Sequence, residues 1–532
     1  MMNSSTGFVL TNGNGEIESL EEVESHQEGG EGKLFSLNPA TGVALGEVEV
    51  TSGEQVEEIW LRAQEAQRHW RRQPLKERIR RCEELFQEVL SWRGQLLELV
   101  EDETGKGSRE SRRELLKACE EIEALFEGGE EVLKARTLKR TLRGQLSQEY
   151  QPRGVALVVA SAYEPLSTVL VAGIANLIAG NGVIVVAERR SPLTVTSLGN
   201  IARSLELPEG LWQTVVGGRT LVDKLAEKAD LILSYGSALQ ARRLARAQGR
   251  RMVPLIGRWP SRDIMIVLGD GQCEAAARAA VEDGCGGGGQ KMRALQRIYV
   301  QESIHDRFVD ALIDELAKWR RRDSPSQGRY SVGPLLEASD LERIESLVRD
   351  ATRKGARLLA GGRRRPRQKG YFYEPTILTS VDESMAIFSE EAVGPVLAIT
   401  TIGAPVEAVQ RSAGAESLGM ASIFSESPTV ASDLARRLDA QYVCINEGFA
   451  SLPVQDLEGL ACLDGPLDLR GVALLREISA SQVLFQARRS PLREKIKKRI
   501  LESHLEEEEL LERKISILYR RGLARLKETF WP

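Results

Sequence analysis

Short, wholly apolar runs that alternate with helical stretches are the feature that most constrains how this chain folds. Val155 to Val159 and Gly182 to Ala187 are runs of this kind, and the stretch 166–179 between them has the composition of a helix. Strands that are apolar on both sides imply a parallel sheet that helices cover on both faces. We therefore predict an α/β fold with a doubly wound, Rossmann-like domain over residues 33–250.

A second α/β series follows from about Met252. Asp263 to Val267 and Arg297 to Gln301 have the composition of strands. We assign this series to a second α/β domain over 251–446, followed by a return segment over 447–489. Within the first domain, amphipathic periodicity predicts long helices over 54–126, and weak alternation predicts a hairpin over 138–152.

The two ends of the chain differ from the rest. Residues 1–32 are rich in Glu, Gly and Ser and lack a cationic stretch followed by an apolar core, so we expect a disordered acidic leader and no signal peptide. Residues 490–532 carry Leu511, Ile515 and Leu518 at helical spacing between Lys/Arg-rich ends. We predict an amphipathic helical extension that docks on the protein itself, with a partner helix or a membrane-surface helix as alternatives.

Charge and cysteine usage exclude several function classes. Lys+Arg at 72 against Asp+Glu at 77 gives a formal net charge of -5, so no overall basic field favours nucleic acid. The six cysteines are scattered, without the spacing of a metal site or a disulfide framework, which is typical of reduced thiols in the cytoplasm. The apolar runs are shorter than the ~20 residues that a membrane span needs. We expect a cytoplasmic protein without a metal and without a transmembrane segment.

A set of ordered motifs runs through the chain from about Leu34 to Leu484. The motifs are Asn38 to Gly42, Glu103 to Lys106, Gly180-Asn181, Leu207 to Gly210, the glycine loop that ends in Gly289-Gln290, and Glu390 to Val396. In this order they resemble the motifs of the aldehyde dehydrogenase superfamily, and the glycine loop is similar to the G-Q-x-C-x-A-x-x-R signature that carries the nucleophile of that family. The resemblance implies a Rossmann-like cofactor domain and a second, catalytic-type α/β domain. It also implies an oligomerisation hairpin at 138–152 and a late strand near 482–485, which build dimers or tetramers.

The positions at which this family carries its chemistry hold other residues here. The resemblance places Met292 where the family has its nucleophilic cysteine, Pro254 where it has its general base, and Tyr163 where an asparagine donates to the forming oxyanion. A thioether has no proton to lose, so Met292 cannot form a thiolate. An oxyanion donor is worth roughly 10²–10³ in rate and a general base about 10²–10⁴. We therefore expect no catalytic residues, and a non-catalytic pseudoenzyme that serves as a scaffold or regulatory subunit.

Cofactor contacts are retained only in part. Gly236 and Ser237 match the phosphate turn of the family, and the helix N-terminus that follows such a turn suits a pyrophosphate. The resemblance assigns Glu391 to the nicotinamide ribose, whereas Val186 replaces the lysine that binds the other ribose. We expect that no cofactor is required, with residual NAD or NADP binding as an open alternative.

Two other functions stay open. The first is a divergent NAD(P)-dependent oxidoreductase that oxidises an aldehyde. Its displaced nucleophile would be Cys285, five residues before Gln290, because the glycines between them allow the loop to shift. The second is a nucleotide-binding sensor without chemistry. In each case we expect a homo-oligomer, or a hetero-oligomer with a related protein, and residues 490–532 offer a further partner surface. The sequence names no aldehyde, partner or pathway.

Overall fold

The structure is a computed structural model. It describes residues 32–141, 144–249, 251–258, 261–291, 293–320, 332–365, 369–390, 392–413, 419–440, 442–449 and 471–487. The described residues belong to two compact units. The larger unit is drawn from Met1–Lys134 and Tyr150–Ala480, and the smaller from Ala135–Glu149 and Ser481–Pro532. The predicted leader over 1–32, except Gly32, and the predicted extension over 490–532 lie outside the described residues.

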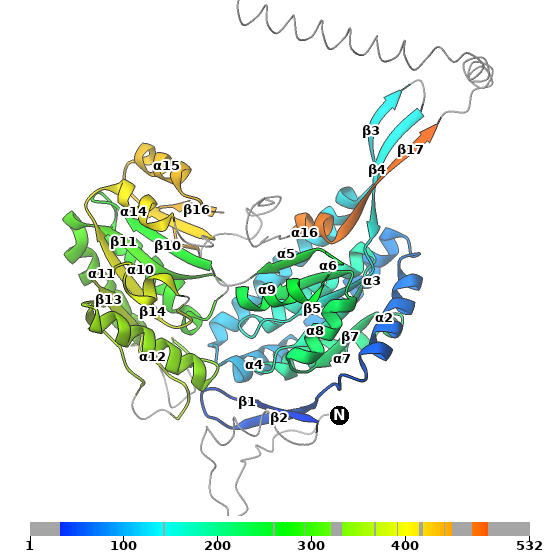
Figure 1. Cartoon of the computed structure of the whole chain (residues 1–532), viewed down its shortest axis with the longest axis horizontal. Helices are drawn as coiled ribbons and strands as arrows, with labels where there is room; N and C mark the ends of the chain where they lie inside the picture. The colour runs from blue at the N-terminus through cyan, green and yellow to red at the C-terminus, as the bar shows by residue number, and fades with distance from the viewer. Residues whose placement is uncertain are drawn as a thin grey trace, which may run out of the picture. The chain divides into compact units, whose positions relative to one another are not determined.

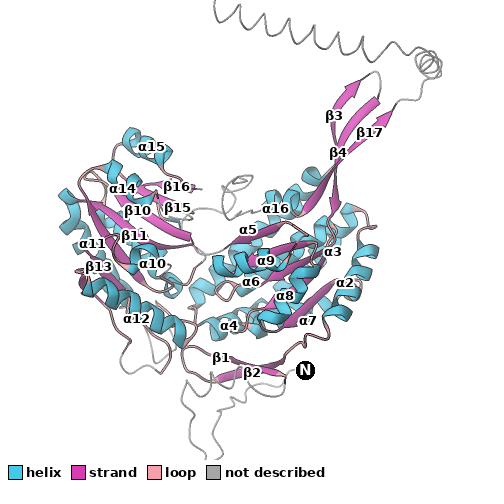
Figure 2. Ribbon diagram, in the orientation of Figure 1, coloured by secondary structure: helices cyan, strands magenta, loops and turns pink. Residues whose placement is uncertain are grey.

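The first part of the larger unit is built on a five-stranded parallel sheet (Figures 1 and 2). Every residue of its three inner strands is buried, as wholly apolar runs predict; these strands are β5 (Val155–Val159), β6 (Gly182–Ala187) and β8 (Leu231–Tyr235). The strand order is β7-β6-β5-β8-β9, with β7 (Trp212–Val216) and β9 (Leu255–Arg258) at the edges. The predicted Rossmann-like α/β fold is confirmed.

Helices pack against both faces of this sheet (Figure 2). Helix α6 (Pro165–Ala179) is apolar almost all round, and every residue except Ser167 is buried, as expected of a helix that the core encloses. It packs against α3, α5 and α7. The other helices of this part are α2 (Val56–Trp70), α3 (Leu75–Ser91), α4 (Arg93–Thr104), α5 (Ser108–Leu133), α7 (Pro192–Arg203), α8 (Arg219–Lys228), α9 (Ala238–Ala247) and α16 (Gly471–Glu477).

The second part of the larger unit contains a seven-stranded sheet of order β12-β13-β14-β11-β10-β15-β16. All neighbours are parallel except β12, which is antiparallel to β13. The strands are β10 (Ser261–Val267), β11 (Arg293–Gln301), β12 (Arg357–Ala360), β13 (Thr376–Thr379), β14 (Val396–Ile402), β15 (Met420–Phe424) and β16 (Tyr442–Ile445). The helices are α10 (Cys273–Cys285), α11 (His305–Arg320), α12 (Ala338–Arg353), α13 (Ala386–Ser389), α14 (Pro405–Ser412) and α15 (Pro428–Arg437), with the 3₁₀ turns η1 (Gly286–Gly289) and η2 (Glu302–Ile304).

The boundary between the two α/β parts differs from the one predicted at residue 250. Strand β9 pairs with β8, so Leu255 to Arg258 complete the first sheet, and the second sheet begins with β10. From the sequence we placed this short run in the second series, because local sequence does not distinguish the last strand of one sheet from the first strand of the next. A further hairpin, β1 (Lys33–Leu37) with β2 (Ala44–Glu49), was not predicted.

The smaller unit is a three-stranded sheet of order β17-β4-β3. Strands β3 (Arg136–Thr141) and β4 (Gly144–Pro152) form the hairpin predicted over 138–152. Strand β17 (Ser479–Ala487) includes the late strand predicted near 482–485. The Gln148 side chain donates a hydrogen bond to Ser481 Oγ (2.8 Å), which links the hairpin to that strand. The oligomerising role of this sheet stays a prediction.

A buried carboxylate fixes the start of helix α7. Glu103, at 1% exposure, lies near the end of α4 and accepts four hydrogen bonds. Its donors are Ser36 Oγ (2.6 Å), the Leu193 amide (2.8 Å), the Thr194 amide (2.7 Å) and Thr194 Oγ1 (2.6 Å). A negative charge at a helix N-terminus is favoured by the helix dipole and satisfies amides that have no partner within the helix.

Replacement of Glu103 by alanine is expected to lower the free energy of unfolding by about 3 kcal/mol, because buried donors lose their shared acceptor. Urea unfolding followed by far-ultraviolet circular dichroism measures this change. Glu98, exposed on the same helix, is the matched control, and Glu98→Ala should change stability by less than about 0.5 kcal/mol. Equal effects at the two positions would contradict the capping role of Glu103.

Candidate functional site

The glycine loop after α10 is held in a backbone conformation that favours glycine. Gly287, Gly288 and Gly289 have φ angles of 63°, 69° and 70°, in the left-handed region. A Cβ built at Gly289 would lie 2.1 Å from the carbonyl oxygen of Gly394, so a side chain at this position cannot be accommodated. The glycines therefore give the loop its shape and let it approach the 394–395 backbone.

The glutamine of the loop motif acts as a clamp. Gln290 is 5% exposed, and its Nε2 donates to the carbonyl oxygen of Pro334 (2.9 Å). Its Oε1 accepts from the Leu336 amide (2.9 Å). These bonds fasten the loop to the segment that precedes α12. Met292, the residue at the family's nucleophile position, lies outside the described residues, and so does Glu391.

Two carboxylates on adjacent turns of α5 bring the glycine loop close to the start of α6. Glu110 Oε1 accepts from the Gly287 amide (3.1 Å). Glu114 Oε1 accepts from the amides of Leu166 and Ser167 (both 3.0 Å) in the first turn of α6. Residues four apart lie on one face of a helix, about 5–6 Å from each other. The loop and the α6 N-terminus are thus anchored to neighbouring points.

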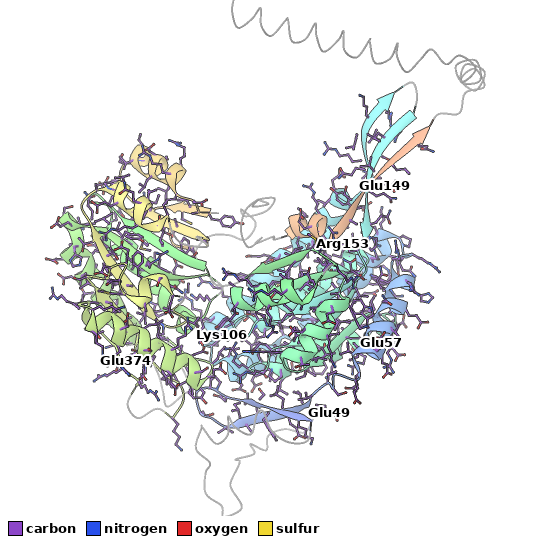
Figure 3. All side chains as sticks on the ribbon, in the orientation of Figure 1. Glu49, Glu57, Lys106, Glu149, Arg153 and Glu374 are labelled. Atoms are coloured by element: carbon purple, nitrogen blue, oxygen red, sulfur yellow. The ribbon has the colours of Figure 1, made fainter. Side chains whose placement is uncertain are left out.

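A buried lysine neutralises one of these carboxylates. Lys106 Nζ lies 2.5 Å from Glu114 Oε2, with side-chain exposures of 10% and 3% (Lys106 is labelled in Figure 3). This ammonium group is held in an ion pair, so it is not available as a nucleophile. Sequence reasoning included Lys106 in a framework motif but missed Glu110 and Glu114. Two glutamates four residues apart on a charged helix usually lie on a solvent-exposed face, so the pattern gave no indication that they anchor other segments.

Tyr163 lies in the turn between β5 and α6, where the family has its oxyanion donor. Ser161 Oγ accepts from the amides of Tyr163 (3.1 Å) and Glu164 (3.3 Å), which fixes this turn. The Arg190 guanidinium carbon is 5.7 Å from the centroid of the Tyr163 ring, close enough for a cation–π interaction. A phenol can donate a hydrogen bond, so Tyr163 retains the donor capacity of the amide that it replaces.

Arg190 is surrounded by carboxylates from both α/β parts of the larger unit. Its Nε lies 3.1 Å from Glu188, and its Nη1 lies 3.5 Å from Glu337 and 3.5 Å from Asp340. Arg189 also pairs with Glu337. Burial alone would lower the pKa of Arg190, but the carboxylates, led by Glu188, outweigh it and raise the pKa. Burial raises the pKa of Asp340 to about 6, against the opposing effect of Arg190.

The phosphate turn of the first sheet fits part of a nicotinamide dinucleotide. Ser237 Oγ accepts from the Gln240 amide (3.1 Å) and caps α9, and the first intrahelical bond runs from Ala241 to Ser237. The amides of Ala238 and Leu239 precede that bond, so a pyrophosphate fits this helix start next to Gly236. Val186 is 2% exposed within β6 and offers no polar group to a ribose.

The two remaining predicted positions supply no accessible base or thiolate. Pro254 precedes β9, and its carbonyl oxygen accepts from the Ile232 amide (2.9 Å), so it serves the sheet. Cys285 is the last residue of α10 and is 1% exposed. Burial raises the pKa of its thiol to about 12, although Lys291 opposes this shift. The side chain is therefore a neutral thiol at physiological pH.

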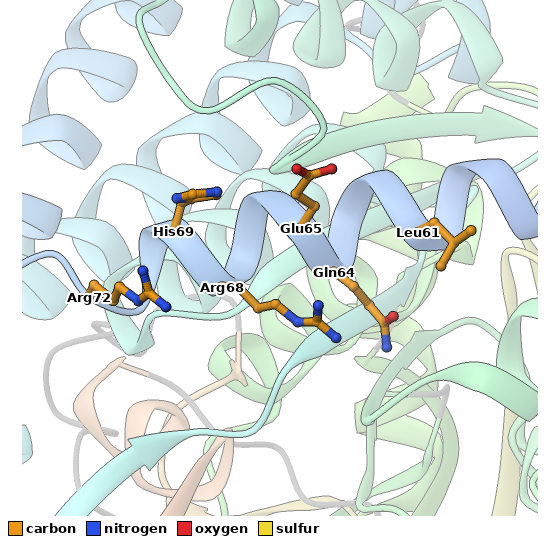
Figure 4. Close-up of a pocket in the computed structure, with 6 residues that line it drawn as sticks. All are labelled: Leu61, Gln64, Glu65, Arg68, His69 and Arg72. Carbon is orange, nitrogen blue, oxygen red and sulfur yellow. The ribbon is translucent and has the colours of Figure 1, made fainter.

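A surface depression on α2 contains none of the predicted site residues described above. It has a volume of about 350 Å³ and is lined by Leu61, Gln64, Glu65, Arg68 and His69 of α2 and by Arg72, which follows that helix (Figure 4). Within the described part of the chain, no group of three or more His, Cys, Asp or Glu side chains could hold a metal ion. No helix among the same residues is long and apolar enough to cross a membrane.

Comparisons with known proteins agree on one family. The model of the aldehyde dehydrogenase family matches residues 26–459. A Mycobacterium ulcerans protein is 29% identical over 416 residues, which cover 77% of this chain and 80% of that protein. Its name describes it as a succinate-semialdehyde dehydrogenase that uses NADP+. An aldehyde dehydrogenase of Paenarthrobacter nicotinovorans is 28% identical over 432 residues, which cover 80% of this chain and 94% of that protein. The crystal structure of succinate-semialdehyde dehydrogenase from Burkholderia pseudomallei has the same fold, with a TM-score of 0.80 at 23% identity, and covers 86% of this chain and 95% of its own.

These comparisons contradict two predictions. The prediction of a non-catalytic pseudoenzyme is wrong, because relatives that share most of the chain are named as dehydrogenases. The prediction that no cofactor is required is also wrong, because the name of the M. ulcerans relative specifies NADP+. The sequence argument equated loss of the family's side chains with loss of activity. Polarisation of a carbonyl needs a hydrogen-bond donor of suitable geometry, and more than one residue type can supply it.

Thiol labelling tests the environment of Cys285. With iodoacetamide at about pH 8, the half-buried Cys119 should react first, whereas Cys285 should react only on unfolding, because its thiol is protonated and inaccessible. Timed labelling followed by peptide mass spectrometry measures both rates, with the equally buried Cys82 as internal reference. Rapid labelling of Cys285 in the native protein would reveal an exposed thiolate and support its role as a displaced nucleophile.

Asp340→Asn tests the carboxylate cluster. The folded-state pKa of Asp340, about 6, lies above its unfolded value of 3.8, so protonation stabilises the folded state. That contribution is fully present below the unfolded pKa and is lost as pH rises through about 6. Relative to the variant, the wild-type protein should therefore lose on the order of 3 kcal/mol between about pH 4 and pH 7.

Chemical unfolding at a series of pH values measures this difference. Asp350 is the control, because a hydrogen bond from the Ala386 amide lowers its pKa, so Asp350→Asn should change the pH profile in the opposite direction. A wild-type profile parallel to that of the Asp340→Asn variant would show that Asp340 does not titrate as described.

Proposed function

Because the chain belongs to the aldehyde dehydrogenase family, we propose that it is an NAD(P)-dependent oxidoreductase that oxidises an aldehyde. The observation that carries this proposal is the joint anchoring of two segments on α5. Glu110 holds the glycine loop, and Glu114 holds the start of α6 directly after Tyr163. The names of relatives that cover most of the chain support the same activity.

The cofactor would bind through the turn between β8 and α9. The Ala238 and Leu239 amides would receive the pyrophosphate. The Gln240 side chain, whose Oε1 lies where a Cβ of Gly236 would point, would have to move aside. When bound, the oxidised nicotinamide supplies the hydride acceptor. The relatives' names favour NADP+, and we propose that either dinucleotide reaches this turn, because the contacts it offers are made by backbone amides that do not distinguish them.

Tyr163 is the group that we propose polarises the aldehyde. Its hydroxyl would donate a hydrogen bond to the carbonyl oxygen. The Arg190 guanidinium, whose charge the surrounding carboxylates balance, would hold the ring through the cation–π contact. A polarised aldehyde adds water to give a hydrate, RCH(OH)₂. Loss of a hydride from carbon to the cofactor and of a hydroxyl proton to solvent water would convert that hydrate to the carboxylic acid. This route balances without a covalent thioester.

The buried state of Cys285 favours the water route over a thiolate route. Water is the nucleophile, so the route needs neither a thiol at the position of Met292 nor, at the position of Pro254, a base that acts on a thiol. We also propose that the chain forms a homo-oligomer through the β3–β4 hairpin and β17. The cytoplasmic location expected from its cysteine usage stays a prediction.

Turnover measurements with variants test this mechanism. The protein is incubated with NAD+ or NADP+ and a panel of aldehydes that includes succinic semialdehyde, and absorbance of the reduced cofactor is followed. Tyr163→Phe should lower kcat by roughly 10²–10³, because the oxyanion donor is lost. Cys285→Ser should leave kcat unchanged. Tyr150→Phe, in the hairpin strand β4, is the matched control and should also have no effect.

Two outcomes would overturn parts of the proposal. If no reduced cofactor forms with any pair of dinucleotide and aldehyde, the proposed activity is wrong. If turnover occurs but Cys285→Ser abolishes it, the oxidoreductase assignment stands and the water route is replaced by a thioester route.

A further inference from the structure

Among the described residues, the outer row of main-chain groups of β7, at the edge of the five-stranded sheet, has a partner only at Val216. In its parallel pairing with β6, the carbonyl of Leu211 accepts from the Val183 amide, so residues 211, 213 and 215 face β6. The N–H and C=O groups of Trp212, Thr214 and Val216 therefore point away from the sheet. An edge of this kind is a template for another strand.

A neighbouring segment already begins such a pairing. The Thr51 amide donates to the carbonyl oxygen of Val216 (2.7 Å), and the Val216 amide donates to Thr51 Oγ1 (3.2 Å). Thr51 follows β2 and covers only the last residue of β7. Among the described residues, no strand pairs with β7 beyond this point, so Trp212 and Thr214 continue an open ladder.

A groove with two helical walls runs along this edge. It has a volume of about 640 Å³. One wall is α2, from which Gln55, just before the helix, with Ile59 and Arg62 line the groove. The other wall is α7, from which Thr196, Asn200 and Arg203 line it. The side chains of β7 alternate between these walls: Gln213 Nε2 donates to the Ile59 carbonyl (2.7 Å), whereas Thr214 lies against Gly199 of α7.

The lining offers polar groups and charges that have no partner among the described residues. Thr214 Oγ1 and Thr196 Oγ1 are buried without a hydrogen-bond partner. Acidic residues lie at both ends: Glu49 at the β2 end, labelled in Figure 3, and Glu209 at the other, and both are exposed. By contrast, Arg62 of the α2 wall is already paired with Glu58 (2.5 Å).

We propose that this groove docks an extended peptide segment of a partner protein, which adds to β7 as a sixth strand. Its main chain would pair with Trp212 and Thr214, beyond the point at which Thr51 pairs with Val216. Its side chains would alternate between the two walls, with a hydroxyl toward Thr196 of α7 and Thr214 of β7 and an apolar group toward Ile59. Basic residues at its ends would face Glu49 and Glu209. This is recognition by strand addition, in which main-chain bonds give affinity and alternate side chains give specificity.

The groove contains none of the residues placed in the aldehyde site, so the proposal is independent of the oxidoreductase activity. The probe is the fluorescein-labelled heptapeptide of sequence KTVTVTK, titrated with the full chain and followed by fluorescence anisotropy. Two N-methylated versions of the peptide, modified on alternate residues, identify the binding mode. One of them should lose at least about tenfold in affinity, and the other should bind nearly as the parent does, because only alternate amides face β7.

Protein variants locate the site. Thr214→Pro removes one outward amide from an edge strand, where proline is tolerated, and should weaken binding about three- to tenfold. Asn200→Trp should block the groove and abolish binding. Glu206→Trp is the matched control, because Glu206 is exposed near the same helix but does not line the groove, and it should bind as wild type. Circular dichroism and thermal unfolding verify that each variant folds.

Three outcomes would overturn the proposal. The first is absence of saturable binding by the parent peptide at millimolar protein. The second is equal loss, or no loss, with the two methylated peptides. The third is binding that appears only after residues 1–31 are deleted, which would make a segment of this chain the occupant in place of a partner. Selective loss with one methylated peptide, together with loss in Asn200→Trp, supports the proposal.

Discussion

Two buried carboxylates at helix starts organise the functional edge of the first sheet. Glu103 of α4 binds the first turn of α7, and Glu114 of α5 binds the first turn of α6. Each places a negative charge where the helix dipole is positive, and each satisfies amides that the helix cannot satisfy itself. Because α6 and α7 directly follow β5 and β6, these bonds decide where the turns that carry Tyr163 and Arg190 lie.

This arrangement separates the frame of the site from its chemistry. The glycine loop, the Gln290 clamp and the α5 carboxylates are main-chain anchors, and their geometry does not depend on which side chain occupies the nucleophile position. The side chains that would meet substrate are free to differ from the family pattern. A phenol beside a guanidinium can then take over polarisation of a carbonyl from an amide.

The sequence was sufficient for those features whose signal is local. Wholly apolar strands predicted the buried parallel sheet, and weak alternation of polar and apolar residues predicted the β3–β4 hairpin. Features that depend on tertiary placement were missed. Glu110, Glu114 and Asp340 look like ordinary charged positions of solvated helices, and only folding shows what they contact. Residues 255–258 were placed with the second domain and were not predicted as a strand, because the pairing partner of a four-residue run cannot be read from the sequence.

The same limit explains the wrong functional prediction. From the sequence we compared single positions with the family pattern, namely Met292, Pro254 and Tyr163. Such a comparison does not show which other hydrogen-bond donors the fold could bring near a carbonyl group. The Arg190 cluster has no counterpart in that reading, because Glu188 and Asp340 are 152 residues apart in the chain and meet only through the fold.

The burial of helix α6 limits how the protein can open locally. It is enclosed by α3, α5 and α7 and exposes almost none of its surface, so water reaches its amides only when those neighbours separate. Local opening of the turn that carries Tyr163, just before α6, therefore cannot spread along the helix without dismantling the first core. Amide hydrogen exchange in the middle of α6 should therefore report global unfolding.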